Sequence, residues 1–225
     1  MGHAAGHVLD GDLTAVDLDR LYEAPTPWMR ANMVATLDGA ANGSDGKTGS
    51  INNSSDKRVF DLLRRWSQAI VVGAGTARIE GYGAARRPTV VVTRQGRLPG
   101  RLRGAEPGKV LLATSASAPG LAESRDVIGA EHCLVAGDDQ VDLAIVRRLL
   151  EERGMTRLLT EGGPQLLGTL LAAGVVDELC LTLVPDLVAG VHPRITAGPD
   201  LDLHLEPRLL LEENGTLLGR WFVGG

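Results

Sequence analysis

Short, almost wholly apolar runs recur along the chain and alternate with segments whose apolar residues follow a helical spacing. Each run is too short for a helix and is rich in β-branched residues, which predicts strands buried on both faces. Strands that alternate with helices indicate an α/β sheet covered by helices on both sides. The expected strands are 30–37, 69–73, 88–92, 110–113, 133–136 and 158–160, and the expected helices are 54–66, 74–78, 143–153 and 164–173.

The C-terminal part has a different pattern. A strand-like apolar run at 175–184 precedes two further runs, 201–211 and 216–223, which are joined at Glu213-Asn214-Gly215. Asn-Gly between apolar runs is a strong hairpin signal, so this part adds antiparallel strands at one edge of the sheet. The Gly-, Pro- and Ser-rich stretch between 113 and 133 is expected to be surface chain.

The first 27 residues are expected to form an ordered arm with a short helix at 14–22, followed by one domain over 28–225. His3 and His7 have a spacing that suits metal ligands, but no cysteine or acidic cluster completes a site, so no metal is expected.

Composition narrows the function. The net charge is −5 and no basic run occurs, which argues against nucleic acid or an anionic membrane as the main partner. No apolar stretch is long enough to span a bilayer, the N-terminus lacks a signal-peptide pattern, and the two cysteines lie in apolar runs. These features favour a cytoplasmic protein.

Glycine turns follow several of the predicted strands. They are Gly73–Thr76, Thr93–Arg97 and Glu161-Gly162-Gly163, the last leading through Pro164 into a helix. Glycines allow close approach of a ligand, and a helix N-terminus suits a phosphate. Ligands of such sheets bind beyond the carboxyl ends of the strands. Three turns at equivalent places predict a dinucleotide cradle without the Gly-x-Gly-x-x-Gly fingerprint, and the polar, glycine-rich loop 40–50 is expected to act as a flap.

The ordered set of motifs resembles a known family. Met33-Val34-Ala35-Thr36-Leu37-Asp38-Gly39, Val72-Gly73-Ala74-Gly75-Thr76, Leu159-Thr160-Glu161-Gly162-Gly163-Pro164 and Val176-Asp177-Glu178-Leu179 are similar to those of the pyrimidine reductase of riboflavin biosynthesis. That enzyme is the C-terminal domain of the bifunctional deaminase–reductase. The resemblance, which begins near Trp28, implies a dihydrofolate-reductase-like three-layer mixed sheet with helices on both faces and a C-terminal antiparallel hairpin. It also implies an NADPH-dependent reduction of a ribosylamino-pyrimidine 5′-phosphate to its ribitylamino form.

The resemblance assigns roles to individual residues. Substrate positions of the family fall on Thr48, Arg64, Arg87 and Glu161, and cofactor positions fall on Val34, Ser50, Thr76 and Glu80. Gly73, Gly162 and Gly163 belong to the cradle, where the turn at Gly163 would take the pyrophosphate. Thr93 and Arg94 suit the 2′-phosphate of NADPH, since an arginine fork pairs well with phosphate. Glu161, Asp56 and Arg64 would hold the substrate, and Asp38 or a water molecule is the candidate proton donor.

Departures from the family leave alternatives open. Many bacterial members carry lysine where this chain has Asn32, and the middle of the segment 80–87 differs from the family pattern. Asp56 lies where dihydrofolate reductases keep a pterin-binding acid, so dihydrofolate is an alternative substrate. A non-catalytic NADPH-binding homologue is a third hypothesis. The apolar strand around 175–188, if it lies at an open edge, predicts a homodimer built on it and on the C-terminal hairpin.

Overall fold

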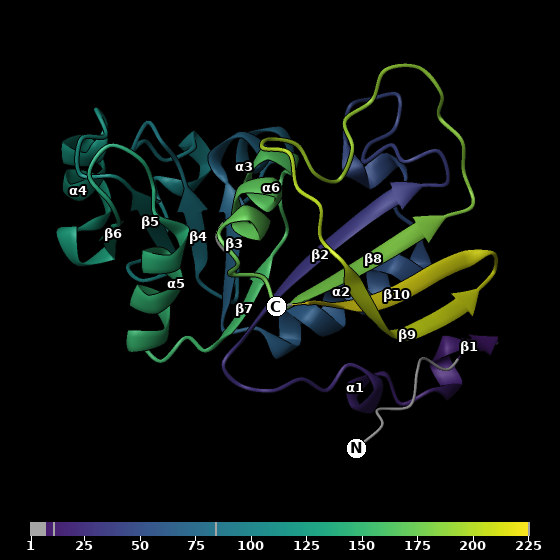
Figure 1. Cartoon of the computed structure of the whole chain (residues 1–225). Helices are drawn as coiled ribbons and strands as arrows, with labels where there is room; N and C mark the ends of the chain where they lie inside the picture. The colour runs from purple at the N-terminus through teal and green to yellow at the C-terminus, as the bar shows by residue number, and fades with distance from the viewer. Residues whose placement is uncertain (1–7, 11, 84, 225) are drawn as a thin grey trace.

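A computed structural model describes residues 8–10, 12–83 and 85–224 of the chain, and these residues form one ten-stranded sheet with helices on both faces (Figure 1). His3 and His7 lie outside the described residues. The strands are β1 Val8–Asp10, β2 Trp28–Thr36, β3 Ala69–Gly73, β4 Thr89–Val92, β5 Val110–Thr114, β6 Cys133–Val135, β7 Arg157–Thr160, β8 Glu178–Val184, β9 Leu205–Glu213 and β10 Thr216–Val223. The helices are α1 Leu18–Leu21, α2 Ser54–Trp66, α3 Ala74–Ile79, α4 Leu121–Ile128, α5 Leu143–Glu152 and α6 Pro164–Ala172, with short 3-10 turns η1 Leu13–Ala15, η2 Thr48–Ser50, η3 Gly100–Leu102 and η4 Ala130–His132.

The strand order is β1-β9-β10-β8-β2-β7-β3-β4-β5-β6. From β8 through β2 to β6 every neighbouring pair is parallel, whereas β10 pairs antiparallel with both β8 and β9. The expected fold class is therefore confirmed, including the C-terminal hairpin, which turns at Asn214-Gly215. Because the central strands are parallel, their carboxyl ends meet at one edge of the sheet, where the glycine turns also lie.

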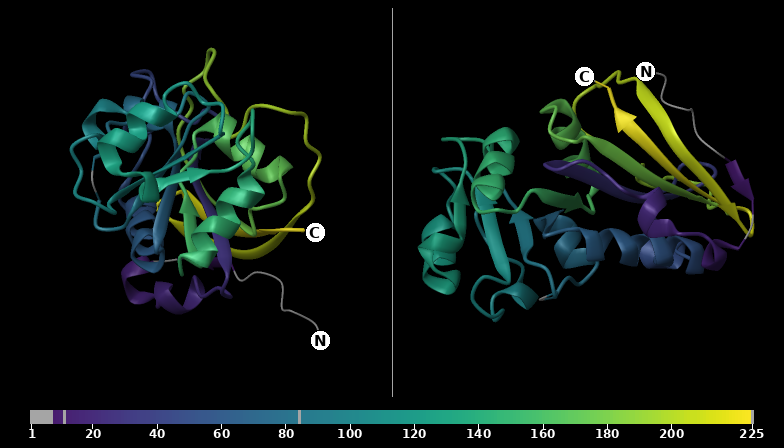
Figure 2. Two further views of the ribbon diagram at one scale, coloured as in Figure 1. Left: turned by 90° about the vertical axis from the view of Figure 1, so that its left-hand side faces the viewer. Right: turned by 90° about the horizontal axis from the view of Figure 1, so that it is seen from below.

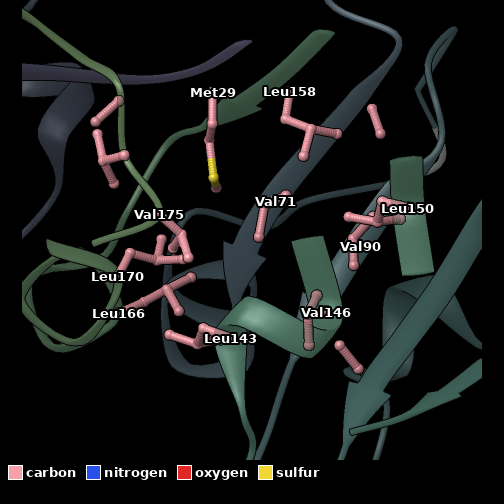
Figure 3. Packing of buried hydrophobic residues seen from close by; sticks show 14 of the residues in the cluster. Met29, Val71, Val90, Leu143, Val146, Leu150, Leu158, Leu166, Leu170 and Val175 are labelled. Carbon is pink, nitrogen blue, oxygen red and sulfur yellow. The ribbon is translucent and has the colours of Figure 1, made fainter. Parts of the chain in front are cut away.

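Helices lie on both faces of the sheet (Figure 2), and a cluster of apolar side chains is buried on each face. On one face, Met29 and Leu158 of the central strands pack against α5 and α6 through Leu143, Val146 and Leu170 (Figure 3). On the other face, α2 and the N-terminal arm bury a second cluster against the strands β7 to β10. Its members are Leu13, Tyr22, Val59, Leu62, Leu63, Leu159, Cys180, Leu209, Leu211 and Leu218.

The two faces of β2 explain why its sequence shows no clear alternation. Met29 and Ala31 belong to the cluster under α5 and α6, whereas the intervening Arg30 and Asn32 point to the side of α2. Arg30 is fully buried because it pairs with Glu178 at 3.0 Å, so a charged residue fits inside a central strand. Asn32 opens onto the cavity described below.

Three expectations are corrected. The stretch between 113 and 133 contains the helix α4, whose apolar residue Leu121 is buried. The predicted helix at 14–22 is two short pieces, η1 and α1, interrupted at Val16 and Asp17. The premise of an open edge at 175–188 is wrong, since β8 lies between β2 and β10 and is hydrogen-bonded on both sides. In the described part of the chain, no helix has the length and apolar character needed to cross a membrane.

Candidate active site

A cavity of about 410 Å³ lies on the α2 side of the sheet, between β2, α2, the loop 40–50 and the segment 80–83 with Ala85. Residues far apart in sequence meet there because the parallel strands place their ends together. The cavity collects most of the side chains that the sequence assigned to substrate and part of those assigned to cofactor. These are Val34, Thr48, Asp56, Arg64, Thr76, Glu80 and Glu161.

Asp56 is the cavity residue whose environment is most unusual. It lies in the first turn of α2, which Asn53 caps by accepting hydrogen bonds from the backbone N–H groups of Ser55 and Asp56, each at 3.1 Å. Asp56 is 2% exposed, and its Oδ1 has no hydrogen-bond partner among the described residues. Burial raises the pKa of this carboxyl above its ordinary value, and the Thr182 hydroxyl offsets part of the effect.

Two other buried polar atoms in the lining share this feature. Asn32 Oδ1 and Thr89 Oγ1 have no partner among the described residues, and both side chains face the cavity. Buried polar atoms are almost always hydrogen-bonded, and each one left without a partner costs about 1–3 kcal/mol. Three such atoms around one cavity indicate that a polar ligand completes their hydrogen bonding.

Arg64 and Glu161 both line the cavity and form an ion pair through two hydrogen bonds. The distances are 2.6 Å from Nε to Oε1 and 2.7 Å from Nη2 to Oε2. The Tyr82 hydroxyl donates a further hydrogen bond to Glu161 Oε2. Burial, reinforced by the charge of Glu161, raises the pKa of Tyr82 far above its ordinary value, so its hydroxyl stays protonated and remains a donor.

Aromatic rings hold the guanidinium of Arg64 in place. Its Cζ lies 4.3 Å from the centre of the Phe60 ring and 5.8 Å from that of Tyr82. Such contacts are favourable for a cation over an aromatic face. Arg64 therefore has a fixed position, and Glu161, which the sequence treated as an independent substrate ligand, acts together with it.

The loop 40–50 forms one wall of the cavity and is hydrogen-bonded to another lining residue, Glu80. The backbone N–H of Thr48 donates to Glu80 Oε1 at 3.1 Å. Behind it, the loop 186–193 supports the same segment, because Ala41 N–H donates to Pro193 O at 2.8 Å and the Asn42 amide meets the His192 ring at 3.0 Å. The loop is thus a cavity wall with specific partners, and its role as a flap stays a prediction.

Asp38, the side chain considered as proton donor, does not line the cavity. Its carboxylate accepts hydrogen bonds from the Thr36 hydroxyl and from the backbone N–H groups of Val188 and Ala189. These bonds, that of Thr36 first, lower the pKa of Asp38. A carboxyl that is ionised at neutral pH and turned to another loop is poorly placed to give a proton to a substrate in the cavity.

The expected cofactor cradle lies beside the cavity. Gly73 N–H donates to Gly162 O and Gly163 N–H donates to Thr76 Oγ1, both at 3.0 Å, so the turns after β3 and β7 are joined. A Cβ built on Gly163 would lie 2.2 Å from Thr76 Oγ1, which explains the need for glycine. Gly163 is also the N-cap of α6, where no side chain caps the first N–H groups.

Four other assigned residues lie outside the cavity lining. Ser50 is exposed and donates to Asp45 and Lys47, while Arg87 donates to the carbonyl of Arg65 at 2.8 Å. Thr93 is buried at the end of β4, where its hydroxyl accepts from Gln95 N–H, and Arg94 beside it is exposed. These placements keep Thr93 and Arg94 at the carboxyl edge of the sheet, whereas Ser50 and Arg87 have local structural partners.

The sequence did not single out Phe60, Tyr82 or Thr89 as site residues. Phe60 lies within the apolar spacing of α2, and Tyr82 lies in the segment that departs from the family pattern. Phe60 and Arg64 are four residues apart on one helix, so their spacing was the signal available for that pair. Tyr82 and Thr89 reach the cavity only through the folding of the chain.

Comparison with known proteins gives a consistent result. The family model described as the RibD C-terminal domain matches residues 27–213. The chain is 30% identical over 206 residues to the 2,5-diamino-6-ribosylamino-4(3H)-pyrimidinone 5′-phosphate reductase of Methanothermobacter thermautotrophicus, with 85% of this chain and 94% of that protein covered. It is also 30% identical over 183 residues to the reductase of the same name from Archaeoglobus fulgidus, with 73% and 83% covered.

Longer relatives and solved structures extend the comparison. The riboflavin biosynthesis protein RibD of Escherichia coli is 25% identical over 199 residues, and the match covers 78% of this chain but only 53% of that protein. Among solved structures, a pyrimidine reductase-like protein of Corynebacterium diphtheriae superposes with a TM-score of 0.78 at 23% identity, covering 88% of this chain and 92% of that one. That structure supports the fold described above.

Proposed function

Because the chain belongs to the RibD C-terminal domain family, we propose that it reduces a ribosylamino-pyrimidine 5′-phosphate to the ribitylamino-pyrimidine 5′-phosphate in riboflavin biosynthesis, with NADPH as reductant. Its named relatives are pyrimidine phosphate reductases, so the chain is an oxidoreductase that uses a nicotinamide cofactor. The observation that carries the proposal is the buried Asp56 carboxyl, whose unpartnered oxygen faces a cavity that also holds the Arg64–Glu161 pair.

The residues beside the cavity fit a nicotinamide dinucleotide. The first turn of α6 offers backbone N–H groups that no side chain of the described residues caps, a position that suits a pyrophosphate. Thr76 and Gly163 would hold that group, and Arg94 would meet the 2′-phosphate that distinguishes NADPH from NADH. When bound, the cofactor supplies the hydride.

Asp56 is suited to the pyrimidine ring. An ionised carboxylate accepts hydrogen bonds at both oxygens, and a 2-amino-4-oxopyrimidine presents two adjacent donors, the ring N–H and the exocyclic amino group. The corresponding edge of a uracil ring presents the N3–H between two carbonyl oxygens, which face a carboxylate less favourably. This geometry favours the 2,5-diamino pyrimidinone over its deaminated form.

The remaining polar groups would hold the ribosyl chain. Arg64 lines the cavity and is fixed by Glu161, Phe60 and Tyr82, so it can bind an anionic or hydroxyl-bearing group without losing side-chain freedom. The ribose ring first opens: the C1′–O4′ bond breaks, O4′ takes a proton and the nitrogen loses one, which gives an imine at C1′. Hydride then adds to C1′ and a proton returns to the nitrogen. Since Asp38 is occupied by the loop 186–190, water is the proton source in this proposal.

Dihydrofolate is the second candidate substrate, and a specific observation favours it. Its pterin ring carries the same two donors for Asp56. In addition, the acidic and basic residues in the lining are Asp56, Glu80 and Glu161 against Arg64, an acidic balance that suits a ring with donors better than a phosphate. The phosphate of a ribosyl substrate would therefore have to lie outside this acidic part of the lining.

One assay separates these functions. Purified protein is mixed with NADPH and, in turn, the 2,5-diamino pyrimidinone phosphate, the deaminated uracil analogue and dihydrofolate, and loss of NADPH absorbance is followed. The proposal predicts turnover of the diamino compound above the other two. Faster turnover of dihydrofolate would favour the second candidate. Binding of NADPH by calorimetry without any turnover would mean a non-catalytic homologue.

The proposal includes a homodimer, although the open edge first expected for it does not exist. One face of β8, β9 and β10 carries partly exposed apolar side chains, and among the described residues no helix covers it (Figure 1). Cross-strand pairing places these side chains on one surface. They are Leu181, Leu183, Leu210, Leu217 and Trp221.

A sheet face of this kind suits the self-complementary contact of a two-fold dimer. Light scattering should give about twice the chain mass of 23.7 kDa, and Leu183→Glu should shift it to one chain. Val127→Glu, on an exposed position of α4, is the control. A wild-type mass of one chain at all concentrations would contradict the dimer. The proposal also places the enzyme in the cytoplasm, which suits its two buried free cysteines.

A further inference from the structure

The first turn of α2 is held from outside by the hairpin of β9 and β10. The Asn53 side chain, which caps this turn, donates through Nδ2 to Thr216 Oγ1 at 2.8 Å. Two residues further on, the Ser55 hydroxyl donates to Glu213 Oε2, and Arg58 pairs with the same oxygen. Asp56 therefore lies between residues that Glu213 and Thr216 fix on both sides.

Glu213 is buried at this position and hydrogen-bonded through both carboxylate oxygens. It is 6% exposed, and its second oxygen, Oε1, accepts the backbone N–H of Leu13 at 2.9 Å. Leu13 belongs to the N-terminal arm and is itself buried under α2. One carboxylate thus joins the arm, the hairpin and the helix turn, and both of its oxygens have charged or polar donors.

Such support matters because a carboxyl binds its ligand well only within a narrow range of orientations. A side chain in a site must be held within about 0.5 Å by residues whose own positions are locked. Asn53 accepts a hydrogen bond from the backbone N–H of Asp56. Its own side chain is held in place by the hydrogen bond to Thr216. Groups that do not line the cavity therefore help to keep Asp56 directed at it.

We propose that Glu213 is a positioning residue: by holding Ser55 and Arg58 it directs Asp56 into the cavity, with Thr216 and the arm at Leu13 completing the support. The inference goes beyond the proposed reaction, on which it rests only for the choice of ligand. It assigns to the N-terminal arm and to the C-terminal hairpin a role in ligand recognition.

The first test is a double-mutant cycle read by binding, with no cofactor present. Calorimetry measures the affinity of 7,8-dihydrofolate and of the 2,5-diamino pyrimidinone phosphate. Glu213→Gln keeps the shape of the side chain and should weaken binding about tenfold, in the range of other residues that orient ligands indirectly. Glu206→Gln, on the same strand in a surface pair with Arg208, should leave binding within about twofold.

The coupling between the substitutions at Glu213 and Asp56 decides whether the inference holds. In the Asp56→Asn background, Glu213→Gln should add less than about twofold, because the residue it positions has already been changed. A loss of the same size in both backgrounds would mean that Glu213 stabilises the fold in general and would overturn the inference.

The second test needs no ligand and uses Thr216→Val, which removes the anchor of Asn53 without changing any charge. Carboxyl ¹³C NMR follows the titration of Asp56, which faces Thr182 from β8 and shares the cavity with Arg64, Glu80 and Glu161. Thr216→Val and Glu213→Gln should both move the Asp56 midpoint toward the ordinary aspartate value. An unchanged midpoint in both variants would contradict the inference. Failure of the wild type to bind either ligand would instead count against the proposed function, and this titration would still decide the role of Glu213.

Discussion

Arg64 and Glu161 meet through two parallel hydrogen bonds of 2.6 and 2.7 Å, although 97 positions separate them in the chain. Glu161 is 4% exposed in its side chain, and the Tyr82 hydroxyl occupies part of its remaining capacity. The pair therefore behaves as one unit in which the acid orients the guanidinium. Substitution of either residue should therefore change the same property of the site, the position of the Arg64 guanidinium.

Replacing Arg64 by lysine keeps the charge but removes the planar fork. A lysine cannot make both bonds to Glu161, and it loses the stacking on Phe60. We expect kcat/KM for the preferred substrate to fall at least about tenfold, in line with the loss of a charge-assisted pair of hydrogen bonds. Steady-state kinetics measures this. Arg148→Lys, on the exposed face of α5, is the control. Equal activity of wild type and Arg64→Lys would show that the fork has no role.

Asp56→Asn should change how ligand binding depends on pH. In the wild type, affinity for a ligand with the 2-amino-4-oxo edge rises as pH increases through the raised pKa of Asp56, because the ionised form accepts both donors. The asparagine variant should bind weakly with no such rise. Calorimetry across pH gives both curves, and parallel curves would rule out Asp56 as the group that meets this edge.

The same substitution should affect stability in the opposite sense. Burial makes folded Asp56 hold its proton more tightly than the unfolded chain does, so its contribution to stability is present at low pH. That contribution is lost as pH rises through the folded pKa. Asp56→Asn should therefore be more stable than wild type at alkaline pH and nearly equal at acid pH, which urea unfolding can measure. The reverse order would contradict this account.

Gly163→Ala tests the cradle. The added Cβ would lie 2.2 Å from Thr76 Oγ1, so the joint between the turns after β3 and β7 must open. We expect the Kd for NADPH to rise at least about tenfold, whereas the fold stays intact because the turn is at the edge of the sheet. Gly104→Ala, where nothing lies within 4 Å of the new carbon, is the control. Unchanged NADPH affinity would place the pyrophosphate elsewhere.

Arg94→Gln tests the choice between NADPH and NADH. Arg94 is exposed next to Thr93, at the end of β4. If it meets the 2′-phosphate, its removal should raise KM for NADPH about tenfold and leave KM for NADH nearly unchanged, since one ionic hydrogen bond contributes about 1.5–3 kcal/mol. A similar change in both values would indicate a general effect on the fold.

Glu178→Gln tests the buried charges that join β2, β8 and β10. Glu178 pairs with Arg30 at 3.0 Å and with Arg220 at 2.6 Å, and its side chain is fully buried. Removing its charge should cost about 3–5 kcal/mol of unfolding free energy, because two buried guanidinium groups lose their counter-charge. Urea unfolding measures the loss. Glu152→Gln, in an exposed pair on α5, should change stability by less than about 0.5 kcal/mol.

Glu178 also sets a pH dependence. Its burial opposes ionisation, but the neighbouring Arg220 and Arg30 more than offset this and lower its pKa. Its contribution to stability is therefore present above the unfolded pKa of a glutamate and is lost as pH falls through the folded value. The difference between wild type and Glu178→Gln should shrink on acidification, and a constant difference would exclude this linkage.

Much of the fold follows from local sequence. The buried strands are recognisable because parallel strands covered on both faces must be apolar throughout, and the hairpin turn is recognisable because Asn214 and Gly215 both adopt positive φ. The glycine turns after β3 and β7 were equally visible, since each follows a strand end. A helix is harder to predict from local sequence where polar and apolar residues mix without a clear period. The helix α4 lies in such a stretch and was not predicted.

The sequence by itself determined the α/β class, the strands that carry the site, the family to which the chain belongs and a polar subset of the residues around the cavity, among them Asp56, Arg64 and Glu161. The tertiary structure alone decided that β8 is an interior strand, that Asp38 supports a loop, that Glu161 is committed to Arg64 and that Tyr82 completes the pair. The reason is physical. Strand and turn propensities act over a few neighbouring residues, whereas the partner of a buried charge is chosen by whichever group the whole sheet brings within hydrogen-bonding distance.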